Sequence, residues 1–162
     1  MRSLLLLLLP LLALGCPANL ASVCDLPTDL PTDVDDGRGK ATRSDGAAFN
    51  ELASWSPGTN ASVDVGLLDM ILAKDETGTD FDQLVGDNAF PFCVRLGARG
   101  DKTGQADDNE SASVSDATHT GGVAVLKLDA NTLIGRFQVT VVNSGTGAVI
   151  SFTDGAFKAH RL

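Results

Sequence analysis

The chain has 162 residues and a formal net charge of −9, with 17 Gly, no Tyr and one Trp. Without an N-terminal leader and a spacer, roughly 115 residues would remain, which is enough for one domain with a modest core. The surplus of negative charge argues against nucleic acid as a partner. Because Gly, Val, Thr, Ser and Asp are abundant and Tyr is missing, the composition favours a turn-rich β protein over a helical one.

Residues 1–15 are predicted to be an export signal. Arg2 provides a positive start, an apolar run follows over residues 4–14, and the small residue Gly15 precedes Cys16. The run is too short to span a hydrocarbon core, which needs about 20 residues. A buried core helix is disfavoured by the near-pure leucine content of the run and by its place at the N-terminus.

Residues 13–16, Ala-Leu-Gly-Cys, resemble the lipobox of bacterial lipoproteins. The resemblance implies cleavage before Cys16 and conversion of its thiol to a thioether with diacylglycerol, whose acyl chains, such as palmitate, hold the protein on a membrane. An ordinary secretory leader cut at the same place is the alternative, because Ala13 and Gly15 also satisfy the small-x-small rule. We expect the lipidated form, since a cysteine directly follows the cut and a spacer follows the cysteine.

Cys24 and Cys93 remain as an even pair once Cys16 carries lipid. Compartments outside the cytoplasm permit disulfides. A bond between the two would close a loop of about 70 residues and stabilise the fold by a few kcal/mol. The alternative is a buried free thiol at Cys93, which lies in an apolar run. The sequence leaves both open.

Residues 16–45 are predicted to be a lipid anchor followed by a flexible, disordered acidic tether, and residues 46–162 to be a β-rich envelope domain. The tether contains the tetrapeptide Leu-Pro-Thr-Asp twice in succession, over residues 26–33. Proline alternating with Thr and Asp favours extended, polyproline-like chain over packed structure. We expect the tether to hold the domain away from the lipid, with its carboxylates repelling anionic head groups.

From residue 46 on, short apolar segments separated by Gly, Asn and Asp predict strands. The predicted elements of this half are a strand over residues 47–55, a turn over residues 56–60, a strand over residues 62–73, a helical turn over residues 80–85, a strand over residues 90–96 and a long loop over residues 97–110.

The C-terminal part contains the clearest strand signals. The predicted strands cover residues 111–117, 122–128, 133–143, 148–152 and 156–160, with turns at residues 144–147 and 153–155. The last of these strands predict an antiparallel meander. A total of seven or eight strands predicts an all-β fold, either an antiparallel β-sandwich or a small barrel.

The chain ends with Gly135-Arg136-Phe137, a hairpin, and Asp154-Gly155-Ala156-Phe157. This Gly-x-Phe and Asp-Gly-x-Phe ending resembles the closing strands of a loose group of uncharacterised bacterial lipoproteins with a β-rich domain. The resemblance covers the leader and the C-terminal strands, and it implies a fold and an envelope location. Its glycines let the backbone kink or turn and its phenylalanines fill a core, so no catalytic residue is carried over.

No catalytic site, metal site or cofactor is predicted. His119 and His160 have no zinc-ligand spacing, and a Gly-x-Ser-x-Gly nucleophile motif is missing. Residues 33–37 begin like a calcium loop, but Gly37 stands where a fifth-position ligand is needed and Ser44 where a twelfth-position Glu is needed. Solvated loop charge is the simpler interpretation of such acidic runs.

The sequence therefore predicts a lipid-anchored β domain with a structural or binding role, on the extracytoplasmic side of the bacterial cell membrane or outer membrane. Its partners would be the membrane, through Cys16, and envelope proteins, and a non-enzymatic role is favoured. The alternatives are a lipocalin-like small-molecule carrier and a carboxylate-based hydrolase. An internal apolar cavity would favour the carrier, two converging carboxylates in a cleft the hydrolase, and a filled core the structural or binding domain.

Overall fold

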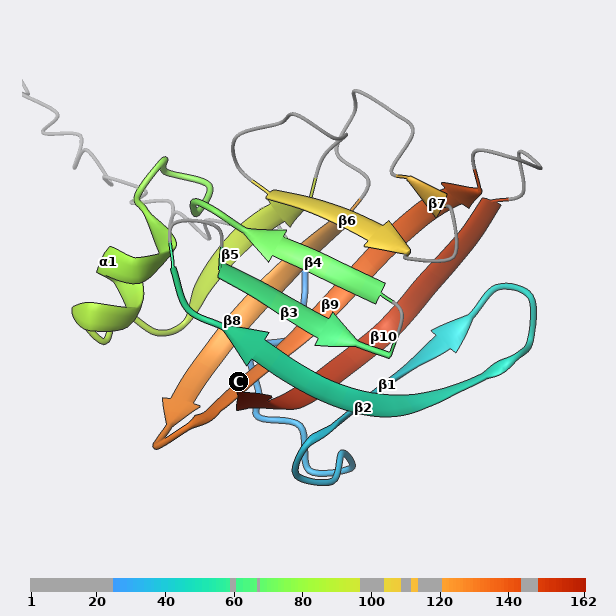
Figure 1. Ribbon diagram of the computed structural model, residues 1–162, viewed down its shortest axis with the longest axis horizontal. Coiled ribbons are helices and arrows are strands. Elements are labelled where there is room, and N and C mark those ends of the chain that lie inside the picture. Colours follow the sequence, from blue (N-terminus) through green and yellow to red (C-terminus); the bar gives the residue numbers. More distant parts are fainter. Residues whose placement is uncertain are drawn as a thin grey trace, which may run out of the picture.

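The computed structural model describes residues 25–58, 61–66, 68–96, 104–108, 112–113, 121–143 and 149–162. Over these residues the chain is all-β, with one short helix (Figure 1). In chain order the elements are β1 (Arg38–Arg43), β2 (Ala48–Ser56), β3 (Ala61–Val65), β4 (Leu68–Leu72), α1 (Phe81–Gly86), β5 (Phe92–Leu96), β6 (Gly104–Asp108), β7 (Ala112–Ser113), β8 (Gly121–Asp129), β9 (Thr132–Asn143) and β10 (Val149–Arg161).

The strands form one sheet that curls into a nearly closed barrel (Figure 1). β9 and β10 pair antiparallel along almost their whole length, and β1 pairs with both β10 and β2. From β2 the pairing passes through β3, β4, β6 and β7 back to β9, which closes the circle. β8 pairs with β9, and β5 pairs with β8. The predicted antiparallel all-β fold is confirmed, and of the two predicted architectures the barrel is observed.

Apolar side chains of the described residues form a core inside this barrel. Successive side chains of a strand point to opposite faces, and in β3 and β4 every second side chain is buried. Met70, Phe137 and Phe157 are completely buried, as are valines and leucines from β5, β8 and β9. Small barrels of about eight strands are just wide enough for side chains to fill. The core is therefore built by the alternation that the sequence displays.

The two glycines of the C-terminal motif make room for the two phenylalanines. Gly135 lies opposite Phe157 and Gly155 lies opposite Phe137 in the pairing of β9 with β10. A Cβ atom on Gly135 would lie 2.5 Å from the Phe157 ring and 2.6 Å from the carbonyl oxygen of Ala124. A Cβ atom on Gly155 would lie 2.5 Å from the carbonyl oxygen of Phe137. Each ring thus occupies the space that a side chain on the opposite strand would need.

Several predicted boundaries differ from the structure. The single strand predicted over residues 62–73 is the hairpin β3–β4, with Gly66 at a φ of +60° after β3. The turn predicted at residues 153–155 is a β-bulge inside β10, where Asp154 has a φ of +52°. β6 lies within the predicted loop of residues 97–110, and the predicted turn at residues 144–147 lies outside the described residues. A C-terminal antiparallel meander is present, but its members are β8, β9 and β10, because the strands predicted over residues 148–152 and 156–160 are parts of one strand, β10.

The second half of the predicted tether also differs from expectation. β1 begins at residue 38 and pairs on both sides, so the barrel includes chain from before residue 46. Of the residues that precede β1, Leu26 and Val34 expose only 8% and 5% of their surface. Burial of these two side chains requires contact with the barrel, which a freely extended spacer would not make.

Candidate functional site

Of the three cysteines predicted as site residues, the structure describes only Cys93. Cys16 and Cys24 lie outside the described residues, as does His119. Cys93, on β5, is disulfide-bonded. Because the chain has three cysteines, the partner of Cys93 is Cys16 or Cys24. The structure therefore favours a disulfide over the buried free thiol at this position.

Cys93 lies on the outer face of the barrel wall. Its neighbours Phe92 and Val94 belong to the interior core, so the side chain between them points the other way. Cys93 is directly opposite Ala124 of β8 in the strand pairing, and only 6% of its surface is exposed. Ala124 in turn forms a small apolar cluster with Leu26 and Leu126. The disulfide therefore adjoins the place where the N-terminal segment packs on the wall.

Residues 25–37, which we call the arm, cross the outer surface of the barrel from this cluster to β1. Arg136 of β9 donates from Nε to the carbonyl oxygen of Asp29, at 3.0 Å, and from Nη2 to a carboxylate oxygen of Asp29, at 2.7 Å. Its side chain is mostly buried, with 17% exposed. A guanidinium that binds two acceptors of one residue fixes both position and orientation.

Further contacts continue the arm toward β10. Nε2 of His160 lies 3.0 Å from a carboxylate oxygen of Asp36. The backbone N–H of Gly37 donates to the carbonyl oxygen of Lys158 at 2.9 Å. In Figure 1 the arm is the blue segment that passes behind the barrel and leads into β1. The arm therefore contacts β8, β9 and β10 in turn.

The two copies of the Leu-Pro-Thr-Asp repeat are in different environments. Leu26 is buried, whereas Leu30 exposes 48% of its surface. Asp29 binds Arg136, and Asp33 pairs with Lys40. The hydrogen bond from Lys40 holds the pKa of Asp33 below its usual value. Identical tetrapeptides thus have unequal contacts, because only the first lies over the apolar part of the wall.

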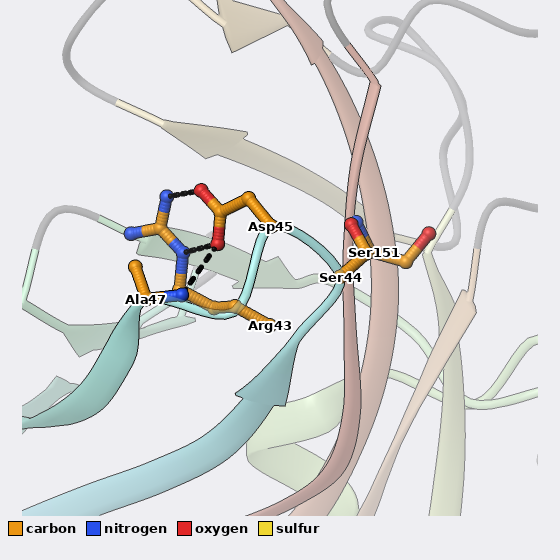
Figure 2. A network of polar contacts seen from close by, with 5 residues as sticks. All are labelled: Arg43, Ser44, Asp45, Ala47 and Ser151. Atoms are coloured by element: carbon orange, nitrogen blue, oxygen red, sulfur yellow. Dashed lines mark hydrogen bonds and ion pairs between the residues drawn. The ribbon is translucent and has the colours of Figure 1, made fainter.

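A second polar network fixes the turn between β1 and β2 against β10. Figure 2 shows Arg43 binding Asp45 through two bonds, from Nε at 3.1 Å and from Nη2 at 2.7 Å, and the Ala47 N–H donating to the same carboxylate at 3.0 Å. These bonds hold the pKa of Asp45 below its usual value. The Ser151 N–H donates to the Ser44 hydroxyl, while the Ser44 N–H donates to the Ser151 carbonyl oxygen, both at 2.9 Å. These bonds all join groups within the protein, which indicates a structural role.

Asp64 of β3 and Asp69 of β4 form a carboxyl pair that sequence analysis missed. They lie directly opposite each other on the outward-facing positions of the two strands. Burial raises the pKa of Asp64, and a hydrogen bond with Asp69 offsets part of this rise. In the sequence the two residues stand at equal distances from the β3–β4 turn. Their pairing can therefore be predicted only after the hairpin has been recognised. Neighbouring carboxyl groups of this kind can share a proton.

A surface pocket of about 270 Å³ lies beside α1. Two of its lining carboxylates already have partners. Asp80 forms an ion pair with Lys74 at 2.7 Å, and Asp82 accepts a hydrogen bond from the Gly58 N–H at 3.2 Å. The only charged residue classed as buried among the described residues, Asp75, accepts bonds from the N–H groups of the turn that follows it. These carboxylates therefore stabilise loops.

Neither a metal cluster nor a spanning helix occurs in the described part of the chain. No three His, Cys, Asp or Glu side chains there are placed to hold a metal ion together. None of the helices in that part has the length and apolar character needed to cross a bilayer. Comparison of the chain with family models, with curated proteins and with solved structures finds no match.

Proposed function

We propose that this protein is a lipid-anchored domain of the bacterial cell envelope, held on the extracytoplasmic side by lipid on Cys16, with a structural or binding role toward envelope components. The leader and the lipobox-like residues 13–16 support the anchor. The disulfide at Cys93 supports a compartment outside the cytoplasm, because thiols in the cytosol are kept reduced.

The observation that carries the structural or binding role is the apolar core that the described side chains form inside the barrel. Phe137, Phe157 and Met70 point into the interior and are completely buried, together with aliphatic side chains from the surrounding strands. A carrier holds its ligand in an interior space of roughly 300 Å³ or more, which side chains must leave open. Burial of these large side chains in the interior favours a domain that acts through its outer surface.

Replacing Cys16 with Ala tests the anchor. In a bacterial host that processes lipoproteins, the wild-type chain is expected in the membrane fraction, to partition into detergent and to incorporate labelled palmitate. The Cys16→Ala variant is expected to lose all three properties. Cys24→Ser is the matched control and should keep them. Processing and membrane retention of Cys16→Ala would contradict the proposal.

A further inference from the structure

We propose that Cys24 is the disulfide partner of Cys93, and that this bond holds the N-terminal end of the arm on the barrel wall a few residues after the lipid. The disulfide itself stands on the geometry of the arm. Its consequence for membrane distance rests on the proposed lipid anchor at Cys16.

The course of the arm points to Cys24. In the barrel the order of neighbouring strands is β10, β9, β8, β5. Followed backward along the chain, the arm contacts β10 through Asp36, β9 through Asp29 and β8 through Leu26. The next strand in that direction is β5, which contains Cys93. If the chain keeps this direction beyond Leu26, it reaches the strand of the bonded cysteine.

The length of chain between Leu26 and Cys24 allows a disulfide with Cys93. Leu26 lies in one apolar cluster with Ala124, which is directly opposite Cys93. Directly opposed residues in an antiparallel pair have Cα atoms about 4.5–5.5 Å apart, and two residues of extended chain span at most about 7 Å. Disulfides join Cα atoms about 4.4–6.8 Å apart. Cys24 is two residues from Leu26 and can meet this limit, whereas Cys16 is ten residues from Leu26.

Bond formation follows ordinary thiol–disulfide exchange. The thiolate of one cysteine attacks the disulfide of an oxidised dithiol partner protein, and the second thiolate then displaces that partner from the mixed disulfide. One Sγ–Sγ bond forms, the two cysteines lose two electrons and two protons, and the partner is reduced to a dithiol. The buried position of Cys93 then protects the bond from reductants.

The bond would shorten the free link to the membrane. With Cys16 in the lipid and Cys24 bonded to Cys93 on β5, only residues 17–23 remain as a link, and the eight steps from Cys16 to Cys24 span at most about 29 Å. The predicted spacer, residues 16–45, is several times longer. We infer that the wall formed by β5 and β8 lies near the membrane.

Counting free thiols tests the pairing. The full-length Cys16→Ala chain is equilibrated in a glutathione redox buffer, so that export does not affect the result, then denatured without reductant and labelled with a maleimide polymer. No label is expected on Cys16→Ala, and one label is expected when either Cys24→Ser or Cys93→Ser is added. Two labels on Cys16→Ala would overturn the inference, because Cys24 and Cys93 would then both be free.

The same assay separates this inference from the proposed function. A wild-type chain isolated from a lipoprotein-processing host should carry no label, since lipid occupies Cys16. One label on that chain, with none on Cys16→Ala, would reject the lipid anchor and leave the disulfide intact.

The contribution of the arm has its own readout. Leu26→Ala should lower the equilibrium constant for closing the disulfide in the glutathione buffer by about tenfold, because the undocked chain no longer holds the thiol at the wall. Leu30→Ala, the same change in the exposed copy of the repeat, should leave the constant unchanged. Equal constants for the two variants would overturn the link between docking and the bond.

Discussion

The arm, residues 25–37, and the hairpin β9–β10 secure the barrel in contrasting ways. The hairpin is held by continuous pairing from Val149 opposite Val142 to His160 opposite Thr132, with a single bulge. The arm has no strand pairing and depends on a few separate contacts, chiefly those of Leu26, Asp29 and Asp36. The hairpin therefore loses little when one surface contact is removed, whereas the arm depends on each of its contacts.

A repeated sequence pattern predicts the environment of each residue in the hairpin but not in the arm. In the hairpin the alternation of apolar and polar residues matches the alternation of inward and outward faces, so each residue's place follows from its neighbours. In the arm the repeated Leu-Pro-Thr-Asp does not fix the environment, because one leucine is buried and the other exposed. The position of the arm is decided by side chains on distant strands.

The largest expected effect is in the hairpin. Gly135→Ala should lower the free energy of unfolding by about 3 kcal/mol, because its Cβ would lie 2.5 Å from the Phe157 ring and 2.6 Å from a backbone oxygen. Urea unfolding monitored by Trp55 fluorescence measures this. Gly86→Ala is the control, since a Cβ there meets nothing within 4 Å, and it should cost nothing. Equal stability of the two variants would contradict the packing described for the motif.

A smaller effect is expected at the start of the arm. Leu26→Ala should cost about 2 kcal/mol, at the low end for a buried leucine because its cluster is small. Leu30→Ala should change the free energy of unfolding by less than about 0.5 kcal/mol, as an exposed side chain does. The same urea titration measures both. Equal changes in the free energy of unfolding for Leu26→Ala and Leu30→Ala would contradict the docking of the arm.

The contact between Arg136 and Asp29 should contribute less to the free energy of unfolding than Leu26 does. Arg136→Gln is expected to cost about 1 kcal/mol, because a mostly buried guanidinium loses two bonds to Asp29. Lys127→Gln removes an exposed pair with Asp129 and should cost less than about 0.5 kcal/mol. Limited proteolysis near Asp29 gives an independent readout, with faster cleavage expected only for Arg136→Gln.

The smallest expected effect is a pH dependence on the wall of β3 and β4. Burial raises the pKa of Asp64, so the folded state binds its proton more tightly than the unfolded chain does. Its ionisation therefore costs stability as the pH rises through the folded pKa, and acid restores it. Asp64→Asn should raise the melting temperature at neutral pH and lose this advantage in acid.

Asp33→Asn should show the opposite sign. The bond from Lys40 lowers the pKa of Asp33, so its contribution is present above the unfolded pKa and is lost as the pH falls through the folded pKa. A small loss of melting temperature at neutral pH that vanishes in acid is expected. Parallel pH curves for wild type, Asp64→Asn and Asp33→Asn would contradict both assignments.

Much of the fold could be predicted from the sequence. Short apolar segments located β2, β5, β8 and β9, and turn residues located most of their ends. The bulge at Asp154 was predicted as a turn, because the dipeptide Asp-Gly is common in turns and in bulges alike. Only the pairing of β10 with β9 shows that it is a bulge. The β3–β4 turn was missed because apolar residues continue through it.

The arm could not be predicted in the same way. Proline, Thr and Asp favour extended chain whether or not the chain is docked, and Leu26 alone gives no periodicity. Its docking depends on Ala124 and Arg136, which are about a hundred residues away in the chain. The cysteine pair was the one long-range signal available from the sequence.

Docking of the arm on the barrel wall is tested most directly by nuclear Overhauser contacts between methyl groups, in full-length protein with labelled leucine and alanine methyls. We expect contacts from the Leu26 methyls to the Ala124 methyl, with none from Leu30 to Ala124. Absence of the Leu26–Ala124 contact, with unfolded-chain shifts for Leu26 as for Leu30, would contradict it.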